Sequence, residues 1–210
     1  MRKVITNDRD NVLKQLHLSG RIVENLDKYV DLLEREQAKM NLVGRSTLPA
    51  VWTRHVLDSA QLFKLLTPAD KCVFDLGSGA GFPALVLAIM DDKREHDFHL
   101  AESDGKKCDF LNKVIEACGL KAKVHNERIE QMEKFGADVI TARALAPLDL
   151  LLKYACPFFK TKTRCLFMKG LKADEELAAA ARKYAFHFEK IPSVTSDEGR
   201  ILLLSGVKRK

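Results

Sequence analysis

Asp75-Leu76-Gly77-Ser78-Gly79-Ala80-Gly81-Phe82-Pro83 is the stretch on which the fold depends. A short apolar run, Cys72-Val73-Phe74, precedes it, and a helical apolar stretch, residues 83–90, follows it. The sequence therefore predicts a strand, a glycine-rich turn and a helix. Glycines in such a turn let the backbone bend tightly and let a ligand approach closely. In an open α/β sheet the ligand crevice lies at the carboxyl ends of the strands, so we expect a binding site here.

The residues around the glycines narrow the type of ligand. The dinucleotide fingerprint G-x-G-x-x-G fails because Phe82 stands where the third glycine should be. The phosphate loop fails because no lysine follows the glycines. Asp75 places a carboxylate just before the turn, which suits a cationic ligand and is poor for pyrophosphate. S-adenosylmethionine has a sulfonium, an ammonium and no phosphate, so the turn predicts this cofactor.

Two later segments offer further parts of a cofactor site. Glu102 ends the second expected strand, about twenty residues past the last glycine, where an acidic side chain can accept both ribose hydroxyls. The alternative is a solvated loop carboxylate. Residues 126–130 follow the third expected strand. They can offer backbone groups to an adenine edge, or they can be an ordinary helix start.

The rest of the chain is expected to form helices first and then alternating strands and helices. Apolar residues recur at helical spacing over Arg21–Met40, and a second helix is expected over Val51–Leu66. Downstream, strands alternate with helices, which implies βαβ units and a mostly parallel sheet closed by a terminal hairpin. The expected strands are 72–75, 98–102, 122–125, 137–141, 164–168, 186–191 and 201–205, and the expected helices are 83–90, 104–118, 146–158 and 172–184.

Composition and charge exclude several classes of protein. Over 210 residues, 35 basic and 29 acidic side chains give a net charge of +6, which is compatible with a nucleic-acid partner without requiring one. The polar start MRKVITNDRD is unlike a signal peptide, and the longest apolar run is far short of a membrane span. The five cysteines lack C-x-x-C spacing, so no zinc cluster or disulfide framework is indicated. We expect a cytoplasmic protein with neither a metal nor a membrane partner.

Several motifs match one known family. They are Asn41-Leu42, RHVLDS at 54–59, the glycine turn, Glu102-Ser103 with Gly105-Lys106-Lys107, Arg128-Ile129-Glu130, TARA at 141–144 and Met168-Lys169-Gly170. With them the chain resembles, over about residues 20–205, the bacterial small-subunit ribosomal RNA guanine-N7 methyltransferases, the RsmG or glucose-inhibited division protein B family. Ala84, where the family usually has glycine, and the charged stretch 91–97 depart from the family pattern.

The resemblance implies an α/β fold, that of a Rossmann-like class I S-adenosylmethionine-dependent methyltransferase. Residues 68–210 would form a mostly parallel seven-stranded sheet with a C-terminal antiparallel strand, and residues 1–67 a helical extension packed on it. The implied reaction is methyl transfer to N7 of a specific guanine in 16S ribosomal RNA, free or in the small subunit. We expect a monomer. The expected cofactor contacts are Asp75, Gly77, Gly79, Gly81, Phe82, Glu102, Ser103, Ile129, Glu130 and Arg143.

The residues near the fourth strand agree with an N7 acceptor. Guanine N7 carries a free lone pair, so methylating it needs positioning and no general base. The chain reads TARALAP at 141–147, in place of the Asn/Asp-Pro-Pro-aromatic motif of exocyclic-amine methylases. Arg143, Lys169 and His55 are the candidates for positioning the base, because arginine and lysine recognise guanine acceptors well. The alternatives are a packed histidine at 55 and a surface arginine at 143.

Other functions stay open from the sequence. A class I methyltransferase acting on another RNA, a small molecule or a protein would share this fold and cofactor. A cofactor sensor or nucleic-acid scaffold without turnover is disfavoured by the retained glycines, Glu102 and Arg143, and a nicotinamide-dependent enzyme by Asp75 and Phe82. The basic residues that could hold the RNA backbone are Arg45, Arg54, Lys106, Lys107, Lys169, Lys172 and Lys208-Arg209-Lys210.

Overall fold

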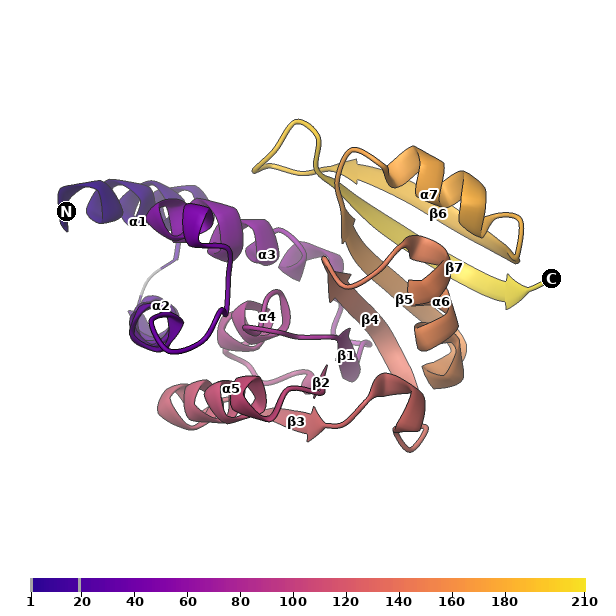
Figure 1. The fold of residues 1–210 in the computed structure, drawn as a ribbon, viewed down its shortest axis with the longest axis horizontal. Coiled ribbons are helices and arrows are strands. Elements are labelled where there is room, and N and C mark those ends of the chain that lie inside the picture. The colour runs from indigo at the N-terminus through magenta and orange to yellow at the C-terminus, as the bar shows by residue number, and fades with distance from the viewer. Residues whose placement is uncertain (1, 19) are drawn as a thin grey trace.

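A mixed β-sheet forms the centre of the molecule (Figure 1). The computed structural model describes residues 2–18 and 20–210. Within these ranges the sheet has seven strands in the order β3-β2-β1-β4-β5-β7-β6, and β7 alone runs in the direction opposite to the other six, as predicted. The strands are β1 Cys72–Leu76, β2 Asp97–Glu102, β3 Ala122–Asn126, β4 Ala137–Arg143, β5 Phe159–Lys169, β6 Tyr184–Pro192 and β7 Arg200–Arg209.

Helices cover both faces of this sheet (Figure 1). Apolar residues of α2, α4 and α5 share one buried cluster with Val73, Leu100 and Leu166. Helices α6 and α7 share the other cluster with Phe74 and Ile140, so alternate strand residues enter opposite layers. The helices are α1 Arg2–Leu16, α2 Gly20–Gln37, α3 Asp58–Ala60, α4 Ala84–Met90, α5 Gly105–Cys118, α6 Leu148–Ala155 and α7 Ala173–Ala180.

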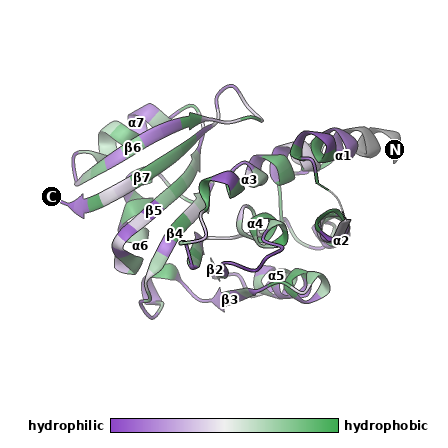
Figure 2. Cartoon of the chain, turned by 180° about the vertical axis from the view of Figure 1, so that it is seen from behind, coloured by the Kyte–Doolittle hydropathy of each residue, from purple (hydrophilic) through white to green (hydrophobic). Residues whose placement is uncertain are grey.

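The sequences of α4 and α5 explain the burial of the first helix and the two ends of the second. Helix α4 is buried from Ala84 to Ile89 and is largely green in Figure 2, since it lies in the core and needs no polar face. Helix α5 begins after Asp104, whose side chain accepts hydrogen bonds from the backbone N–H groups of Lys106 and Lys107. It ends at Gly119, which adopts φ +60°. The predicted ends of α5 are confirmed.

The N-terminal helical segments are packed into the same core as α4 and α5. Leu26, Tyr29, Trp52 and Val56 are buried in the cluster that covers this face of the sheet. The single helix expected over Val51–Leu66 is instead a succession of short segments, because the helical hydrogen bonding changes along it. They are the π-helix Trp52–Leu57, α3 and the 3₁₀-helix Phe63–Leu65, and the 3₁₀-helix Arg45–Ala50 precedes them.

Other boundaries moved by a few residues. The helix expected over 172–184 ends at Ala180. It cannot reach residue 184, because Tyr184 is the first residue of β6 and pairs with Arg209 of β7. Helix α1 was not predicted as a separate helix, and of its described side chains Val12 is the buried one. In the described ranges, no helix combines the length and the apolar character that crossing a membrane requires.

Candidate functional site

A cavity of about 1130 Å³ lies at the carboxyl ends of β1, β2 and β4. Its walls come from the glycine turn, from the loops that follow β2, β3, β4 and β5, from the segment between α2 and α3, and from the loop between β6 and β7. Ligand pockets for one drug-sized molecule usually hold about 300–1,000 Å³. The space is therefore large enough for a cofactor together with part of a second molecule.

The glycine turn forms one wall and is held by hydrogen bonds from β2 and from α2. Ser78 N donates to Ala101 O at 2.9 Å, and Tyr29 Oη donates to Ala80 O at 2.6 Å from α2. Gly79 adopts φ +57°, and the nearest atom to a Cβ built there is 4.0 Å away, so the side of the turn at Gly79 is open. Tyr29 was not identified from the sequence, because a tyrosine at helical spacing reads as ordinary core.

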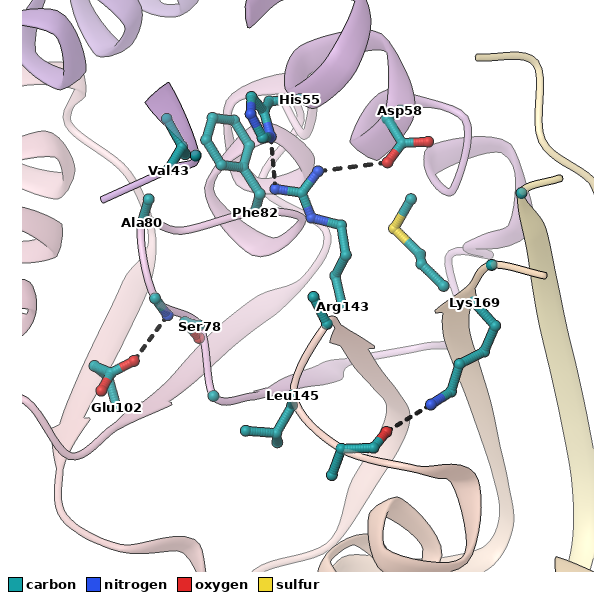
Figure 3. Close-up of a pocket in the computed structure, with 18 of the residues that line it drawn as sticks. Val43, His55, Asp58, Ser78, Ala80, Phe82, Glu102, Arg143, Leu145 and Lys169 are labelled. Carbon is teal, nitrogen blue, oxygen red and sulfur yellow. Dashed lines mark hydrogen bonds and ion pairs between the residues drawn. The ribbon is translucent and has the colours of Figure 1, made fainter. Parts of the chain in front are cut away.

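Glu102 lies at the end of β2 beside this turn (Figure 3). One carboxylate oxygen accepts from Gly79 N and the other from Asp104 N, both at 2.9 Å. Each oxygen keeps a further lone pair for a hydroxyl donor. Ser103 lines the cavity next to it, and so do Ile129 and Glu130, which belong to the 3₁₀-helix Ile129–Gln131 after β3.

Two of the predicted cofactor contacts lie behind the turn, and neither lines the cavity. Asp75 is 1% exposed and accepts a hydrogen bond from Thr141 Oγ1 at 2.6 Å. Burial raises the pKa of Asp75 to about 6, and its Oδ2 has no hydrogen-bond partner among the described residues. A Cβ on Gly81 would collide with Leu85, so this glycine is needed for helix packing.

Arg143, the last residue of β4, is held by three acceptors from the helical segment 52–60 (Figure 3). Nη2 donates to His55 Nδ1 at 2.9 Å, and Nη1 donates to Arg54 O at 3.3 Å and to Asp58 Oδ2 at 3.4 Å. The guanidinium carbon lies 5.0 Å from the centroid of the Phe82 ring. A guanidinium has five N–H groups. Among the described residues, Nε–H and one N–H of Nη2 have no acceptor and are left for a ligand.

His55 is a neutral hydrogen-bond acceptor. Burial, together with the positive charges of Arg143 and Arg54, lowers the pKa of His55 to about 3. Because Nδ1 accepts from Arg143, Nε2 carries the hydrogen and donates to Thr47 Oγ1 at 2.7 Å. Thr47 Oγ1 in turn donates to Gly44 O at 2.7 Å. Both ring nitrogens are therefore engaged, so His55 positions Arg143 and has no lone pair left for a substrate.

Lys169 is likewise engaged within the protein. Its side chain is 8% exposed, and Nζ lies 2.6 Å from Ala146 O and 2.7 Å from Glu176 Oε2. Glu176 also accepts from Leu148 N at 2.8 Å. The loop held in this way begins at Ala144, which adopts a left-handed φ of +55°. Lys169 thus holds the loop after β4 at Ala146, and Glu176 holds it at Leu148. The ion pair between Lys169 and Glu176 joins these two points.

The predicted RNA-binding residues do not share one face. Arg54, Lys107 and Lys169 line the cavity, and Arg128 and Arg200 join them there. Lys208, Arg209 and Lys210 lie at the opposite edge of the sheet, because β7 runs antiparallel and its first residue, Arg200, is the one that pairs with the carboxyl end of β5. Sequence alone could not separate these groups.

Comparison with known proteins identifies the family and agrees with the fold. The family model GidB, rRNA small subunit methyltransferase G, matches residues 22–202. Ribosomal RNA small subunit methyltransferase G of Paramagnetospirillum magneticum is 46% identical over 200 residues, which cover 95% of this chain and 96% of that protein. The protein of the same name from Cereibacter sphaeroides is 43% identical over 201 residues, 95% of this chain and 98% of that one.

Solved structures share the fold at low sequence identity. A putative O-methyltransferase from Klebsiella pneumoniae superposes with a TM-score of 0.60 at 12% identity, covering 93% of this chain and 94% of that one. M. jannaschii TYW2 in complex with AdoMet gives a TM-score of 0.55 at 14% identity, covering 74% and 76%. The class I methyltransferase fold expected from the sequence is confirmed. The chain belongs to the GidB family, the rRNA small subunit methyltransferase G family.

Proposed function

We propose that this chain transfers a methyl group from S-adenosylmethionine to N7 of a guanine in small-subunit ribosomal RNA. Family membership supports the reaction and the RNA. The single observation that carries the proposal is the arrangement of the cavity. The glycine turn and Glu102 lie on one side, and the N–H groups of Arg143 that have no acceptor among the described residues lie on the other.

The residues present fit the cofactor. The open side of Gly79 leaves room for a ligand against the backbone, and Glu102 keeps lone pairs for two ribose hydroxyls. Ile129 and Glu130 would border the adenine, and the unpaired Oδ2 of Asp75 places negative charge beneath the turn for a cationic group. When bound, the cofactor supplies an electrophilic methyl group, and the protein supplies binding and orientation.

Arg143 is proposed to hold the acceptor base. Guanine O6 and N7 are both hydrogen-bond acceptors, but the N7 lone pair must stay free to attack the methyl carbon. Nε–H and the remaining N–H of Nη2 of Arg143 would therefore donate to O6. These bonds would fix the base and leave the N7 lone pair free. Donation to the cofactor carboxylate is the alternative role for the same groups. His55 and Lys169 act indirectly, through Arg143 and through the loop after β4.

No group in this arrangement needs to act as a general base. His55 already accepts through Nδ1, and its low pKa of about 3 makes it a poor proton acceptor. Guanine N7 has no hydrogen to lose before the attack, so orientation of the base is the main requirement. Such a base must be unstacked, which single-stranded RNA regions allow more readily than a duplex.

We further propose that the chain acts as a monomer in the cytoplasm, on 16S ribosomal RNA or on the small subunit itself. Residues 1–67 would serve as an extension that completes the cavity of a 68–210 core, since Thr47, Arg54 and His55 line it. The residues lining the cavity include Lys107, Arg128 and Arg200, which suit a phosphate backbone.

The test is methyl transfer from labelled S-adenosylmethionine to ribosomal RNA, and to small subunits, from a strain lacking this gene. Mapping of the product should place the label on N7 of one guanine. A matched variant, Arg143→Gln, should still bind the cofactor and should lose most of the transfer. Label on another atom, on protein alone or on a small molecule would instead support a class I methyltransferase of different specificity and would overturn the substrate proposal.

A further inference from the structure

The loop between β6 and β7, residues 193–199, forms part of the cavity wall. It is compact, because Ser193 N donates to Gly199 O and Gly199 N donates to Ser196 O, both at 3.0 Å. Val194 is 51% exposed within it. The loop is thus preformed next to the space in which the acceptor base would lie, and it lines that space with Ser193, Thr195, Ser196 and Glu198.

This loop is fastened to the helical segment that carries His55. Thr195 Oγ1 donates to Asp58 Oδ1 at 2.6 Å, and Ser193 Oγ donates to the same oxygen at 3.3 Å. Gln61 Oε1 accepts from Val194 N at 3.1 Å. These bonds join parts of the chain that are more than 130 residues apart in sequence.

The second oxygen of the same carboxylate faces Arg143. Asp58 Oδ2 accepts from Arg143 Nη1 at 3.4 Å (Figure 3). One rigid planar group therefore contacts the loop with one oxygen and the arginine with the other. The two side chains of this ion pair are each 18% exposed. Hydrogen bonds to ionised groups are stronger than those between neutral groups. A displacement of the loop that turns Oδ1 must also move Oδ2 relative to Arg143.

We propose that Asp58 is a positioning residue through which the β6–β7 loop sets the orientation of Arg143, so that RNA seated against the loop aligns the arginine on the acceptor base. The identity of the RNA rests on the proposed function. The coupling itself rests on the shared carboxylate, which gives a contiguous physical link between the two sites.

The loop has the chemistry to meet an RNA strand. Arg200, the first residue of β7, lines the cavity, and its Nη1 donates to Asp197 O and Gly199 O at 2.6 Å each. Its charge is therefore fixed beside the loop hydroxyls. The positive charge of Arg200 and the hydroxyl of Ser196, which both line the cavity, suit the phosphate and sugar of an RNA strand.

The first experiment measures the coupling without RNA. Thr195→Val removes the shortest hydroxyl bond to Asp58 while keeping the size of the side chain. The imidazole nitrogen resonances of His55, which report the bond from Arg143, should shift in Thr195→Val. They should return to their original positions in Thr195→Ser, which restores the hydroxyl. Thr161→Val, on an exposed position of β5, is the matched control and should leave them unchanged. Unchanged His55 signals in Thr195→Val would overturn the coupling.

The second experiment measures catalysis. Thr195→Val should lower kcat/KM for ribosomal RNA by about tenfold, because Arg143 is then less well oriented on the acceptor base. Cofactor binding and Tm should change little. In an Asp58→Asn background, Thr195→Val should have no further effect, because the link is already broken. Additive losses, or an equal loss in cofactor affinity, would overturn the proposal. If the wild-type chain methylates no ribosomal RNA, the proposed function fails, while the resonance measurement still decides the coupling.

Discussion

Nδ1 of His55 accepts a hydrogen bond from Nη2 of Arg143 at 2.9 Å, and this bond gives the imidazole its tautomer. Because Nε2 must then donate to Thr47, the chain of donors runs in one direction from the arginine to Gly44 O. Protonation of His55 would place two donors face to face. The cavity therefore depends on a histidine that stays neutral.

Replacing His55 with asparagine should flatten the pH dependence of stability. The pKa of His55 in the folded chain is about 3, below its ordinary value of 6.5. Between these two values the unfolded chain binds a proton at this histidine and the folded chain does not. Wild-type stability should fall as the pH drops from about 6.5 towards about 3. His55→Asn keeps an acceptor near Nδ1 and should remove up to about 1.4 kcal/mol per pH unit of this slope. Urea unfolding across the range measures it, and equal slopes in both proteins would contradict the assignment.

Asp75 should make cofactor affinity depend on pH. Burial raises its pKa to about 6, so the carboxylate is charged at neutral pH and loses its charge as the pH falls through that value. Calorimetry should show weaker binding of S-adenosylmethionine below about pH 6 for the wild type. Asp75→Asn should bind weakly and without this pH dependence. Asp138→Asn, which changes an acid at the amino end of β4, away from the glycine turn, should retain the wild-type profile.

An added methyl group at Gly79 should weaken cofactor binding. Gly79 and Gly119 have φ values of +57° and +60°, so alanine at either position costs about 1–2 kcal/mol of backbone strain. Only the Cβ at position 79 enters the cavity wall, since Gly119 closes α5. Gly79→Ala should therefore raise the cofactor Kd at least tenfold more than Gly119→Ala, at similar loss of Tm. Equal Kd values for the two variants would show that the cofactor does not touch the turn.

Lys169 and Glu176 should be coupled in stability as well as in activity. Their ion pair is 2.7 Å long and holds the loop after β4. In a double-mutant cycle of Lys169→Met with Glu176→Gln, the coupling energy from urea unfolding should be about 0.5–3 kcal/mol. Lys190 and Asp174 form an exposed pair of the same length and should give a much smaller coupling. Full activity in Glu176→Gln would contradict the role of the ion pair in holding this loop for catalysis.

The affinity for RNA should fall steeply with salt, and Lys107 should contribute to that slope. It lines the cavity, whereas Lys208 lies at the opposite edge of the sheet. Lys107→Gln should reduce the slope of log K against log salt by about one, the signature of one lost phosphate contact. Lys208→Gln should leave it unchanged. Filter binding at several salt concentrations separates the two, and equal effects would place the RNA elsewhere.

Local patterns in the sequence were sufficient to predict most elements. Alternating apolar runs predict the strands, and Asp104 and Gly119 predict the ends of α5 because capping depends on neighbouring residues. The same applies to the glycine turn, whose φ values are a local property. The succession of short helical segments after residue 45 was not predicted, since its apolar spacing fits an α-helix equally well.

The functional geometry depends on contacts that no local pattern reveals. Asp75 is behind the turn because its strand neighbour Thr141 takes its carboxylate. Lys169 is occupied because α7 brings Glu176 beside it. Asp58 could have been suspected from sequence, because it lies one helical turn after His55 on the same face. Its second partner, the loop at 193–195, comes from the other end of the chain.

The position of β7 has a consequence for how the chain is made. Among the described residues, strand β6 pairs with the sheet only through β7, which is the later of the two to be synthesised. A nascent chain that stops before Arg200 therefore exposes the edge of β5 and has no place to dock β6, and such bare edges invite aggregation. The part of the sheet formed by β5, β7 and β6 can therefore assemble only after β7 has left the ribosome. The cavity, whose wall includes Arg200 at the start of β7, is complete only when this strand is in place.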